Sequence, residues 1–340
     1  MRPQKGGRGR RMAAAVGSVL AAGGVAVLLS ACAASQAATV TVPKLAEPTP
    51  AGVSTVPHAQ LSQGTTGQAQ TCHPLESLRP SGPLPKAGHM PAGSTMARIY
   101  QRGYLIAGVD QTTALFGYRN PLNGQLQGFD IDIARQIAQA IFGDPNRIEF
   151  KAITSDQRIP EIRSGSVDIV ADSMTINCAR LKLVDFSTDY FDAGQRILVP
   201  IDSKVSSIGQ LAHQKICAAS GTTSIETIAA EPSHPIPVAA ANWTDCLVMM
   251  QQGQVAAIST DDSVLAGLQS QDPETKLVGP RFTFEPHGIA VSQKSPDLVR
   301  FVNAVLEQMR TDGQWTALYK QWIGSRLGPV PAPPPAEYRG

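Results

Sequence analysis

The chain has 340 residues, which is enough for two ordinary domains, and its content of 42% hydrophobic and 16% charged residues is typical of a globular rather than a disordered protein. The formal net charge is +2, but the first 31 residues carry five basic residues and no acidic one. Without this segment the net charge of the chain is +2 minus 5, or −3. A basic surface for nucleic acid is therefore not indicated.

The first 31 residues are predicted to form a lipoprotein signal peptide. The basic segment RGRR is followed by the apolar run MAAAVGSVLAAGGVAVLL, which ends in LSAC, a match to the bacterial lipobox. In signals of this kind the cysteine carries lipid and becomes the new N-terminus, so Cys32 is the expected anchor. The alternative is a transmembrane helix, but a run rich in Ala and Gly and poor in Leu makes a weak span. The expected location is extracytoplasmic, with lipid holding the protein to the cell membrane.

Residues 32–92 are predicted to be a disordered tether, because Ala, Thr, Pro, Gln, Ser and Gly dominate there and cannot bury a core. The Pro-rich tail, 326–340, is expected to behave in the same way. The folded part is therefore expected from about residue 95 to residue 325.

Strands and helices alternate through this folded part. The expected helix at 128–143 places Ile133, Ile137 and Ile141 on one stripe and ends at Gly143. Such alternation predicts an α/β fold with mainly parallel strands. Strands are expected at 104–109, 148–153, 167–174, 195–201, 215–220 and 255–260, and the other helices at 158–165, 224–231, 244–253 and 295–313.

Two hydroxyls and an arginine follow one of these strands. In SMTINCAR, Ser173 and Thr175 occupy alternate positions, so a strand places them on one face, and Arg180 follows within a turn. Two hydroxyls and a guanidinium close together could bind an anion. Alternatively, Arg180 is a solvated surface charge.

The cysteines beyond the signal peptide point to disulfides rather than metal. An even number of cysteines in an exported chain suggests disulfide bonds. No CxxC or HExxH spacing occurs and the six histidines are scattered, so no metal or cofactor is expected. The cysteines are Cys72, Cys178, Cys217 and Cys246.

Five motifs together carry a family resemblance. LIAGVDQTTALFGYRNPLNGQLQGFDIDIARQIAQAI resembles the opening of the polar-amino-acid solute-binding proteins of bacterial ABC transporters, family 3. VDIVADSMTINCARLKLVDFSTDYFDAGQRILVP resembles their next signature, in which hydroxyl residues and an arginine precede an FS…Y segment. SGTTS, QQGQVAAISTDD and EPHGIAV follow at the family's spacing, so the resemblance covers about residues 95 to 325.

The resemblance implies a type II periplasmic-binding-protein fold, in which two hinge strands join two α/β lobes and the ligand lies in the cleft between them. Lobe 1 would comprise residues 93–199 and 286–325, and lobe 2 residues 200–285. The crossings would lie near LVPID and FEPHG. Closure about the hinge is the expected motion.

The resemblance also implies how a ligand's α-carboxylate is bound. Arg180 and Thr175 match the family positions for this group, and a planar guanidinium can grip a carboxylate with two parallel hydrogen bonds. Thr222 and Thr223, in SGTTS before a helix, are expected to complete the site from lobe 2, because helix N-termini favour anions.

Asp261 matches the family's ammonium-binding aspartate, and the carbonyl of Ser173 is expected to assist it. The alternative for Asp261 is a loop or helix-capping role, which Asp262 could take instead. Both groups of a free amino acid would then have partners.

The ligand's side chain is expected to meet a second arginine. ITSDQRIPEIRSG places Ser155 and Arg158 where the resemblance implies the glutamate- and aspartate-binding branch. An unpaired guanidinium in the cleft would penalise a neutral ligand, and glutamine or asparagine remains the alternative. Phe116 is a candidate for contact with the ligand's carbons, and Asp110 a candidate near its ammonium.

The implied lobes also suggest how the cysteines pair. Cys217 and Cys246 fall in the same lobe and are predicted to form a disulfide. Cys72 would then pair with Cys178, beside the binding loop.

The function implied is capture of a free polar amino acid, glutamate or aspartate in first place, for delivery to an ABC transporter permease. The alternative is a sensor that reports the same ligand to a membrane signalling partner. An enzyme of the same fold, such as a dehydratase, is not expected, because no GxSxG, Cys–His pair or acid/base carboxylate pair falls in the cleft motifs. The sequence leaves open the preferred amino acid and the choice between import and sensing.

Overall fold

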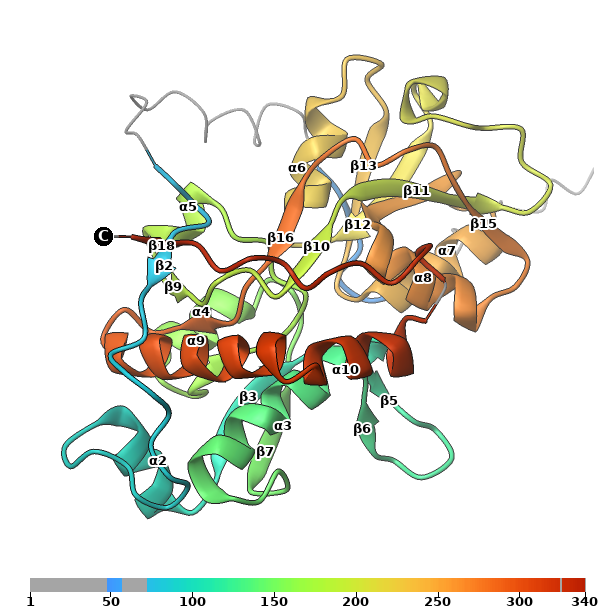
Figure 1. The fold of residues 1–340 in the computed structure, drawn as a ribbon. Coiled ribbons are helices and arrows are strands. Elements are labelled where there is room, and N and C mark those ends of the chain that lie inside the picture. Colours follow the sequence, from blue (N-terminus) through green and yellow to red (C-terminus); the bar gives the residue numbers. More distant parts are fainter. Residues whose placement is uncertain (1–47, 57–71, 325, 340) are drawn as a thin grey trace, which may run out of the picture. The chain divides into compact units, whose positions relative to one another are not determined.

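Residues 48–56, 72–324 and 326–339 are described by the structure, a computed structural model of the chain, and belong to one compact unit, Pro48–Gly340 (Figure 1). The predicted signal peptide and Cys32 lie outside the described residues. Within the described ranges, no helix has the length and hydrophobicity needed to cross a bilayer.

Lobe 1 is built on a five-stranded sheet with the strand order β7-β3-β8-β17-β9. The first three of these strands are parallel, whereas β17 runs antiparallel to both of its neighbours. A small antiparallel sheet of β4, β5 and β6 lies beside it. The strands are β3 (Leu105–Val109), β4 (Thr112–Thr113), β5 (Gly117–Arg119), β6 (Leu126–Gln127), β7 (Ile148–Ala152), β8 (Ile169–Val170), β9 (Asp185–Phe186) and β17 (Ala290–Val291).

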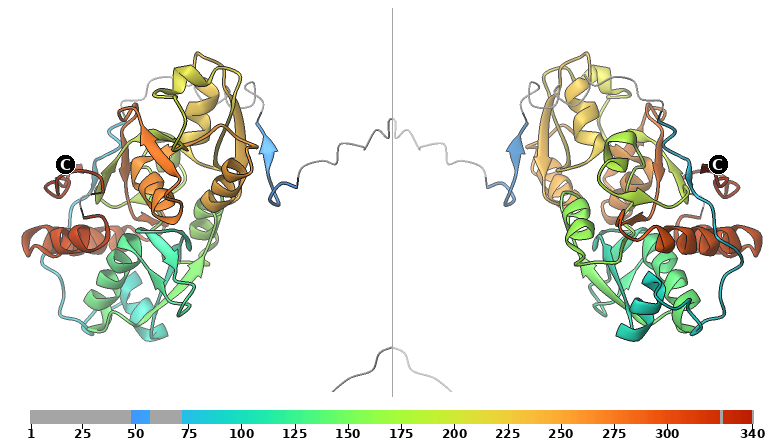
Figure 2. Two further views of the ribbon diagram at one scale, coloured as in Figure 1. Left: turned by 90° about the vertical axis from the view of Figure 1, so that its right-hand side faces the viewer. Right: turned by 90° about the vertical axis from the view of Figure 1, so that its left-hand side faces the viewer.

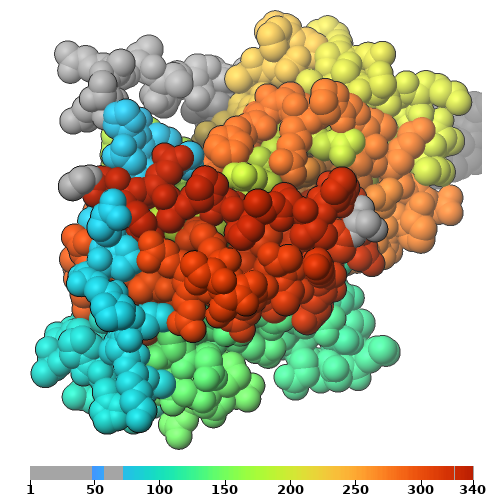
Figure 3. Space-filling model, viewed as in Figure 1, coloured from blue at the N-terminus to red at the C-terminus, as the bar shows by residue number. Residues whose placement is uncertain are grey.

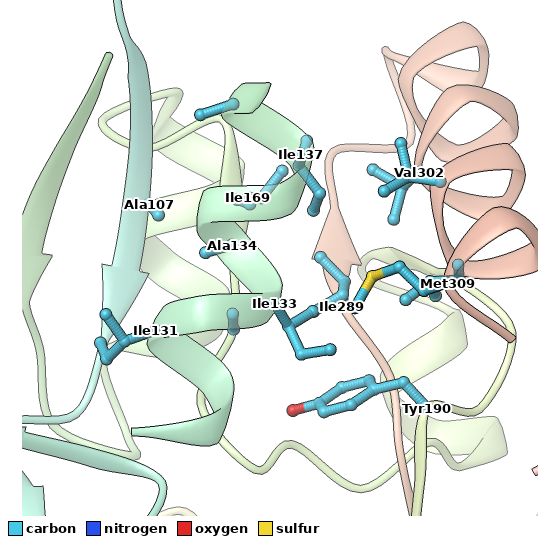
Figure 4. Packing of buried hydrophobic residues seen from close by; sticks show 14 of the residues in the cluster. Ala107, Ile131, Ile133, Ala134, Ile137, Ile169, Tyr190, Ile289, Val302 and Met309 are labelled. Atoms are coloured by element: carbon cyan, nitrogen blue, oxygen red, sulfur yellow. The ribbon is translucent and has the colours of Figure 1, made fainter. Parts of the chain in front are cut away.

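Helices cover this sheet and form the lobe 1 core. The stripe predicted from the sequence is confirmed, since Ile133, Ile137 and Ile141 are completely buried. Figure 4 shows Ile133 and Ile137 on the side of α3 that faces Val302 and Met309. The helices are α2 (Thr95–Arg102), α3 (Phe129–Phe142), α4 (Arg158–Ser164), α5 (Cys178–Leu181), α9 (Pro296–Thr311) and α10 (Gln314–Trp322).

A glycine fixes where α3 begins. Gly128 has a φ of 138°, and a Cβ at this position would strike the carbonyl of Phe116. Only glycine tolerates such a conformation at so close an approach. The first turn of α3 is thereby held against the loop after β3, which also forms part of the site.

Lobe 2, whose residues after 194 are coloured yellow-green to orange in Figure 2, has its own sheet. The strand order is β1-β13-β12-β14-β11-β15. Its central strands β13, β12 and β14 are parallel, and β11 is antiparallel to β14 and β15. The strands are β1 (Ser54–Thr55), β11 (Gln195–Pro200), β12 (Lys215–Ala219), β13 (Ile236–Ala240), β14 (Ala257–Asp261) and β15 (Thr275–Val278), with helices α6 (Thr223–Ala230), α7 (Trp243–Gln251) and α8 (Asp262–Gln271) and the 3-10 helix η2 (Ile208–Leu211).

The chain crosses between the lobes at a two-stranded hinge. Strand β10 (Phe191–Ala193) pairs antiparallel with β16 (Glu285–His287). The expected first crossing near LVPID is wrong, because residues 195–200 form β11 inside the lobe 2 sheet. An apolar strand fits the core of either lobe equally well, so its pattern alone does not say to which lobe it belongs. As observed, lobe 2 comprises residues 194–284 together with the edge strand β1.

Part of the expected tether and tail is packed rather than disordered. Strand β2 (Ser77–Leu78) pairs in parallel with β18 (Tyr338–Arg339), and the two segments lie side by side on lobe 1 (Figure 3). Ser77 is buried and its Oγ donates a hydrogen bond to the carbonyl of Phe186, 2.6 Å away. Backbone pairing, buried polar contacts and a few apolar side chains packed on the lobe 1 core fix these segments; the side chains are Leu78, Leu84, Met90, Leu327 and Val330.

Both predicted disulfides are present. Cys72 is bonded to Cys178, with their Cα atoms 6.1 Å apart, and Cys217 to Cys246, with theirs 5.5 Å apart. The second bond joins β12 to α7 in the lobe 2 core, where both cysteines are completely buried. The first attaches the segment before β2 to the start of α5.

Candidate ligand-binding site

A cavity between the lobes brings together nine of the ten binding residues predicted from the sequence. Ser155 is the exception. It does not line the cavity, and its carbonyl instead accepts a hydrogen bond from Arg158 Nε over 2.8 Å. The nine are Asp110, Phe116, Arg158, Ser173, Thr175, Arg180, Thr222, Thr223 and Asp261.

Arg180 lies in the short helix α5, which fixes its backbone. Asn177 caps α5, and its side chain accepts a hydrogen bond from the backbone N–H of Arg180. The guanidinium, which is buried, donates to the carbonyl of Thr175 (2.7 Å) and to that of Gly221 in lobe 2 (3.3 Å). Burial, and then the charge of Arg158, lower the pKa of Arg180 to about 10, so the group stays charged at neutral pH.

Arg158 lies at the start of α4 and is only 4% exposed. Besides the bond to Ser155, its guanidinium donates to the carbonyl of Asp172 (3.0 Å) and, over 3.5 Å, to that of Gly221. Its Nε lies 3.9 Å from Asp172 Oδ2, beyond hydrogen-bond distance. Both buried arginines therefore donate their hydrogen bonds to backbone carbonyls.

Hydroxyls from both lobes meet in the same cavity. Thr222 caps α6, and its Oγ1 accepts a hydrogen bond from the backbone of Ile225. Thr223 Oγ1 lies 3.4 Å from Thr175 Oγ1 of lobe 1 and donates to Glu285 Oε2 in the hinge. The start of α6 thus faces the lobe 1 hydroxyls, as an anion site shared by two lobes requires.

Asp261 ends β14, with its Oδ2 2.9 Å from Nε2 of His287 in the hinge. The other carboxylate oxygen, Oδ1, is buried and has no hydrogen-bond partner among the described residues. Asp261 lines the cavity, so the wall of the site contains a carboxylate oxygen without a partner. Asp261 does occupy the N-cap position of α8, as the capping alternative expected, but its side chain forms no capping hydrogen bond there.

Asp110 and Phe116 have structural roles beside the cavity. The Asp110 carboxylate accepts hydrogen bonds from the backbone of Gln111 and Thr112 and from the hydroxyls of Thr112 and Thr113. Phe116 is 1% exposed and packs edge-on against Phe191, with ring centroids 5.1 Å apart. Each residue organises the loop after β3 as well as lining the cavity.

Sequence reasoning missed several lining residues, of which two aspartates are the most informative. Asp130 in the first turn of α3 is 1% exposed and accepts hydrogen bonds from Ser173 and from the Tyr190 hydroxyl. Asp172, directly before Ser173, is also buried. An acid inside the apolar runs GFDIDI and VDIVADSM was the available signal. The others missed are Thr113, Gly117, Ser224, Trp243, Thr260 and Val264.

Metal binding has no support in the described part of the chain, where no group of three or more His, Cys, Asp or Glu side chains could hold an ion. The cavity is lined by hydrogen-bonding groups of both charges. Such a lining offers partners to both charges of a zwitterion.

Known proteins share this sequence and fold. The glutamine-binding protein GlnH of a Bacillus subtilis ABC transporter is 39% identical over 230 residues, covering 67% of this chain and 84% of the relative. The glutamate-binding protein GluB of Corynebacterium glutamicum is 27% identical over 253 residues, covering 71% and 85%. An ancestral arginine-binding protein bound to glutamine superposes with a TM-score of 0.60 at 35% identity, covering 66% of this chain and 99% of that one.

These relatives are solute-binding proteins and not enzymes, in agreement with the expectation from the sequence. The predicted type II periplasmic-binding-protein fold is confirmed by the solved structures. The family model of the bacterial extracellular solute-binding proteins, family 3, matches residues 105–325. The chain therefore belongs to the bacterial extracellular solute-binding proteins of family 3.

Proposed function

We propose that this protein captures a free L-amino acid with an acidic side chain, glutamate or aspartate, by closing its two lobes, and delivers it to an ABC transporter permease. The α-carboxylate binds Arg180 and the hydroxyls of Thr175 and Thr223. The α-ammonium binds the free oxygen of Asp261. These assignments give each charged group of the amino-acid backbone an oppositely charged partner.

The observation that carries the acidic side chain is the second buried guanidinium. Arg158 and Arg180 line one cavity, and each donates only to carbonyls. Both also reach toward the same carbonyl, that of Gly221, over long bonds of 3.5 and 3.3 Å. Buried charges need partners of opposite sign. A ligand with two carboxylates supplies one for each arginine.

Glutamine is the second candidate. The relative GlnH is named as a glutamine-binding protein, and the ancestral neighbour is bound to glutamine. In this chain Asp172 Oδ2 lies 3.9 Å from Arg158 Nε and, when ionised, offsets part of its charge. A neutral amide would then be better tolerated beside Arg158.

Calorimetry with glutamate, aspartate, glutamine and asparagine separates the candidates. Removing one partner of a buried charge pair costs about 2–5 kcal/mol, so Arg158→Ala should weaken the binding of the acids by two decades or more. Glutamine and asparagine should lose less affinity than the acids, or should bind more tightly than to the original protein. Arg163→Ala, an exposed residue of the same helix, is the matched control and should change nothing. Equal losses for acids and amides would remove the acidic-ligand proposal.

We also propose that lipid on Cys32 anchors the protein outside the cytoplasm. Support comes from the LSAC motif after an apolar run and from the extracellular family to which the chain belongs. Cys32→Ser should abolish incorporation of labelled palmitate without changing ligand affinity. A variant that is still labelled would contradict the anchor.

Sensing by a membrane signalling partner uses the same cavity. Uptake of labelled glutamate by cells that lack this protein distinguishes the two roles. Lost uptake supports import. Unchanged uptake with a lost cellular response to the amino acid supports sensing.

A further inference from the structure

Three aspartates of lobe 1 line the cavity: Asp130 and Asp172 are buried and Asp110 is half-buried. Their hydrogen bonds differ sharply. The Asp110 carboxylate accepts from two backbone N–H groups and two hydroxyls, and Asp130 accepts from the backbone and hydroxyl of Ser173 and from the Tyr190 hydroxyl. Asp172 is 6% exposed, and its Oδ2 is buried without a hydrogen-bond partner among the described residues. One of the three acids is thus built into the cavity wall without its own donors.

An ionised carboxylate in this position would be costly. Burial of a charge is tolerated when hydrogen bonds and a close counter-ion compensate it. The cation beside Asp172, Arg158, is 3.9 Å away and directs its hydrogen bonds to carbonyls. The Asp110 and Asp130 carboxylates, which line the same cavity, add repulsion.

A proton on Asp172 removes this cost. Burial, and further the charges of Asp110 and Asp130, raise the pKa of this carboxyl well above its usual range, against the opposing effect of Arg158 and Arg180. A protonated carboxyl has one O–H donor and an acceptor oxygen. Asp172 lines the cavity and its Oδ2 has no partner among the described residues, so this oxygen is the one free to carry the donor.

We propose that Asp172 acts as a neutral hydrogen-bond donor to the ligand's side-chain carboxylate, beside Arg158, and that its protonation state sets the preference between acidic and amide ligands. The proposal rests on the function proposed above and deepens it. Protonated Asp172 donates to a carboxylate that Arg158 also holds. Ionised Asp172 repels that carboxylate and accepts instead from the NH2 group of a side-chain amide.

The preference should therefore depend on pH. Between pH 5.5 and 8.5 the side chain of glutamate stays ionised and that of glutamine stays neutral. Any titration of the α-ammonium is common to both ligands and largely cancels in their ratio. As the pH rises and Asp172 loses its proton, glutamate should lose affinity relative to glutamine. Other charged or titratable groups that face Asp172 contribute to the pH profile of any variant: Asp110, Asp130, Arg158, Arg180 and Tyr190.

Two substitutions at one position test the donor. Asp172→Asn keeps an N–H donor of nearly the same shape, whereas Asp172→Leu removes it. At pH 6, the Asn variant should bind glutamate within about threefold of the original protein, and the Leu variant about tenfold or more weakly, the loss of one hydrogen bond to a charged group. The Asn variant should also lose the pH dependence of the glutamate-to-glutamine ratio of Kd values.

Controls keep the outcomes separate. Asp185→Asn, a half-buried carboxyl on β9 outside the cavity, should leave the pH dependence intact. Far-UV circular dichroism and thermal melting check that each variant is folded. If the Asn and Leu variants lose glutamate alike, or if either binds it tenfold more tightly, Asp172 is not a donor and the inference falls. If the unsubstituted protein binds neither glutamate nor glutamine, the proposed function itself fails.

Discussion

The two lobes contribute different chemistry to the cavity between them. Lobe 1 supplies both arginines and three aspartates, whereas lobe 2 supplies a single carboxylate, that of Asp261, together with hydroxyls and the Trp243 ring. Lobe 1 is therefore the lobe that can discriminate ligands by charge. Lobe 2 adds mainly neutral donors that complete the site on closure, so we expect ligands to bind lobe 1 first and lobe 2 to close over them.

The largest effect should come from the lobe 1 clamp. Arg180→Ala removes the α-carboxylate partner, which every amino acid needs, so all ligands should weaken by about 2–5 kcal/mol. Calorimetry across acidic and amide ligands measures this directly. Lys182→Ala, an exposed cation in the same turn, is the control. A loss confined to one class of ligand would show that Arg180 does not hold the shared carboxylate.

The two disulfides should contribute to different properties, one to the stability of the fold and the other to ligand affinity. Replacing Cys217 and Cys246 by Ser opens a 29-residue loop in the lobe 2 core and should lower the free energy of unfolding by about 3 kcal/mol. Replacing Cys72 and Cys178 frees the start of α5, which carries Arg180, and should weaken ligand binding by roughly threefold to tenfold.

Urea unfolding and calorimetry on both double variants make this comparison. A mild dithiol should reduce Cys72–Cys178 first, because Cys72 is exposed and the lobe 2 pair is completely buried. Equal effects of the two pairs on ligand affinity would contradict the special role of the bond at α5.

A smaller effect should follow from blocking closure. Gly267 on α8 of lobe 2 approaches lobe 1 so closely that a Cβ would strike the carbonyl oxygen of Ala114 and lie 3.3 Å from Thr113 Cγ2. A backbone atom cannot rotate away, so Gly267→Ala should hold the lobes apart and cost about 1–2 kcal/mol of binding, roughly tenfold. Gly209→Ala, which meets open space, is the control. Unchanged affinity in Gly267→Ala would mean that ligands bind without this contact.

Much of this architecture follows from local sequence. The apolar stripe of α3, the hydroxyl pair before Arg180 and the acid that ends β14 depend on periodicity and on motif order, which the chain itself displays. The packing of Ser77 does not, because it depends on Asn303 and on the carbonyl of Phe186, both more than 100 residues away.

Asp172 was missed for a different reason. A carboxylate just after an apolar strand has no partner close by in the sequence to reveal its role. Its surroundings come from the loop after β3, from α3 and from α4, which only the fold brings together. The same is true of the hinge, whose position depends on which sheet accepts β11.

The register of the hinge has a consequence for modularity. Ala193 and Glu285 are directly paired across β10 and β16, so the chain leaves lobe 1 and returns to it at neighbouring points. Lobe 2 between them has its own sheet, its own hydrophobic cluster and its own disulfide. Geometrically it is a domain inserted into a host domain, and segments with adjoining ends are the ones that proteins tolerate as insertions. The stretch 194–284 carries every strand of that sheet except the edge strand β1, and it is thus a natural unit for grafting onto a lobe 1 of different charge.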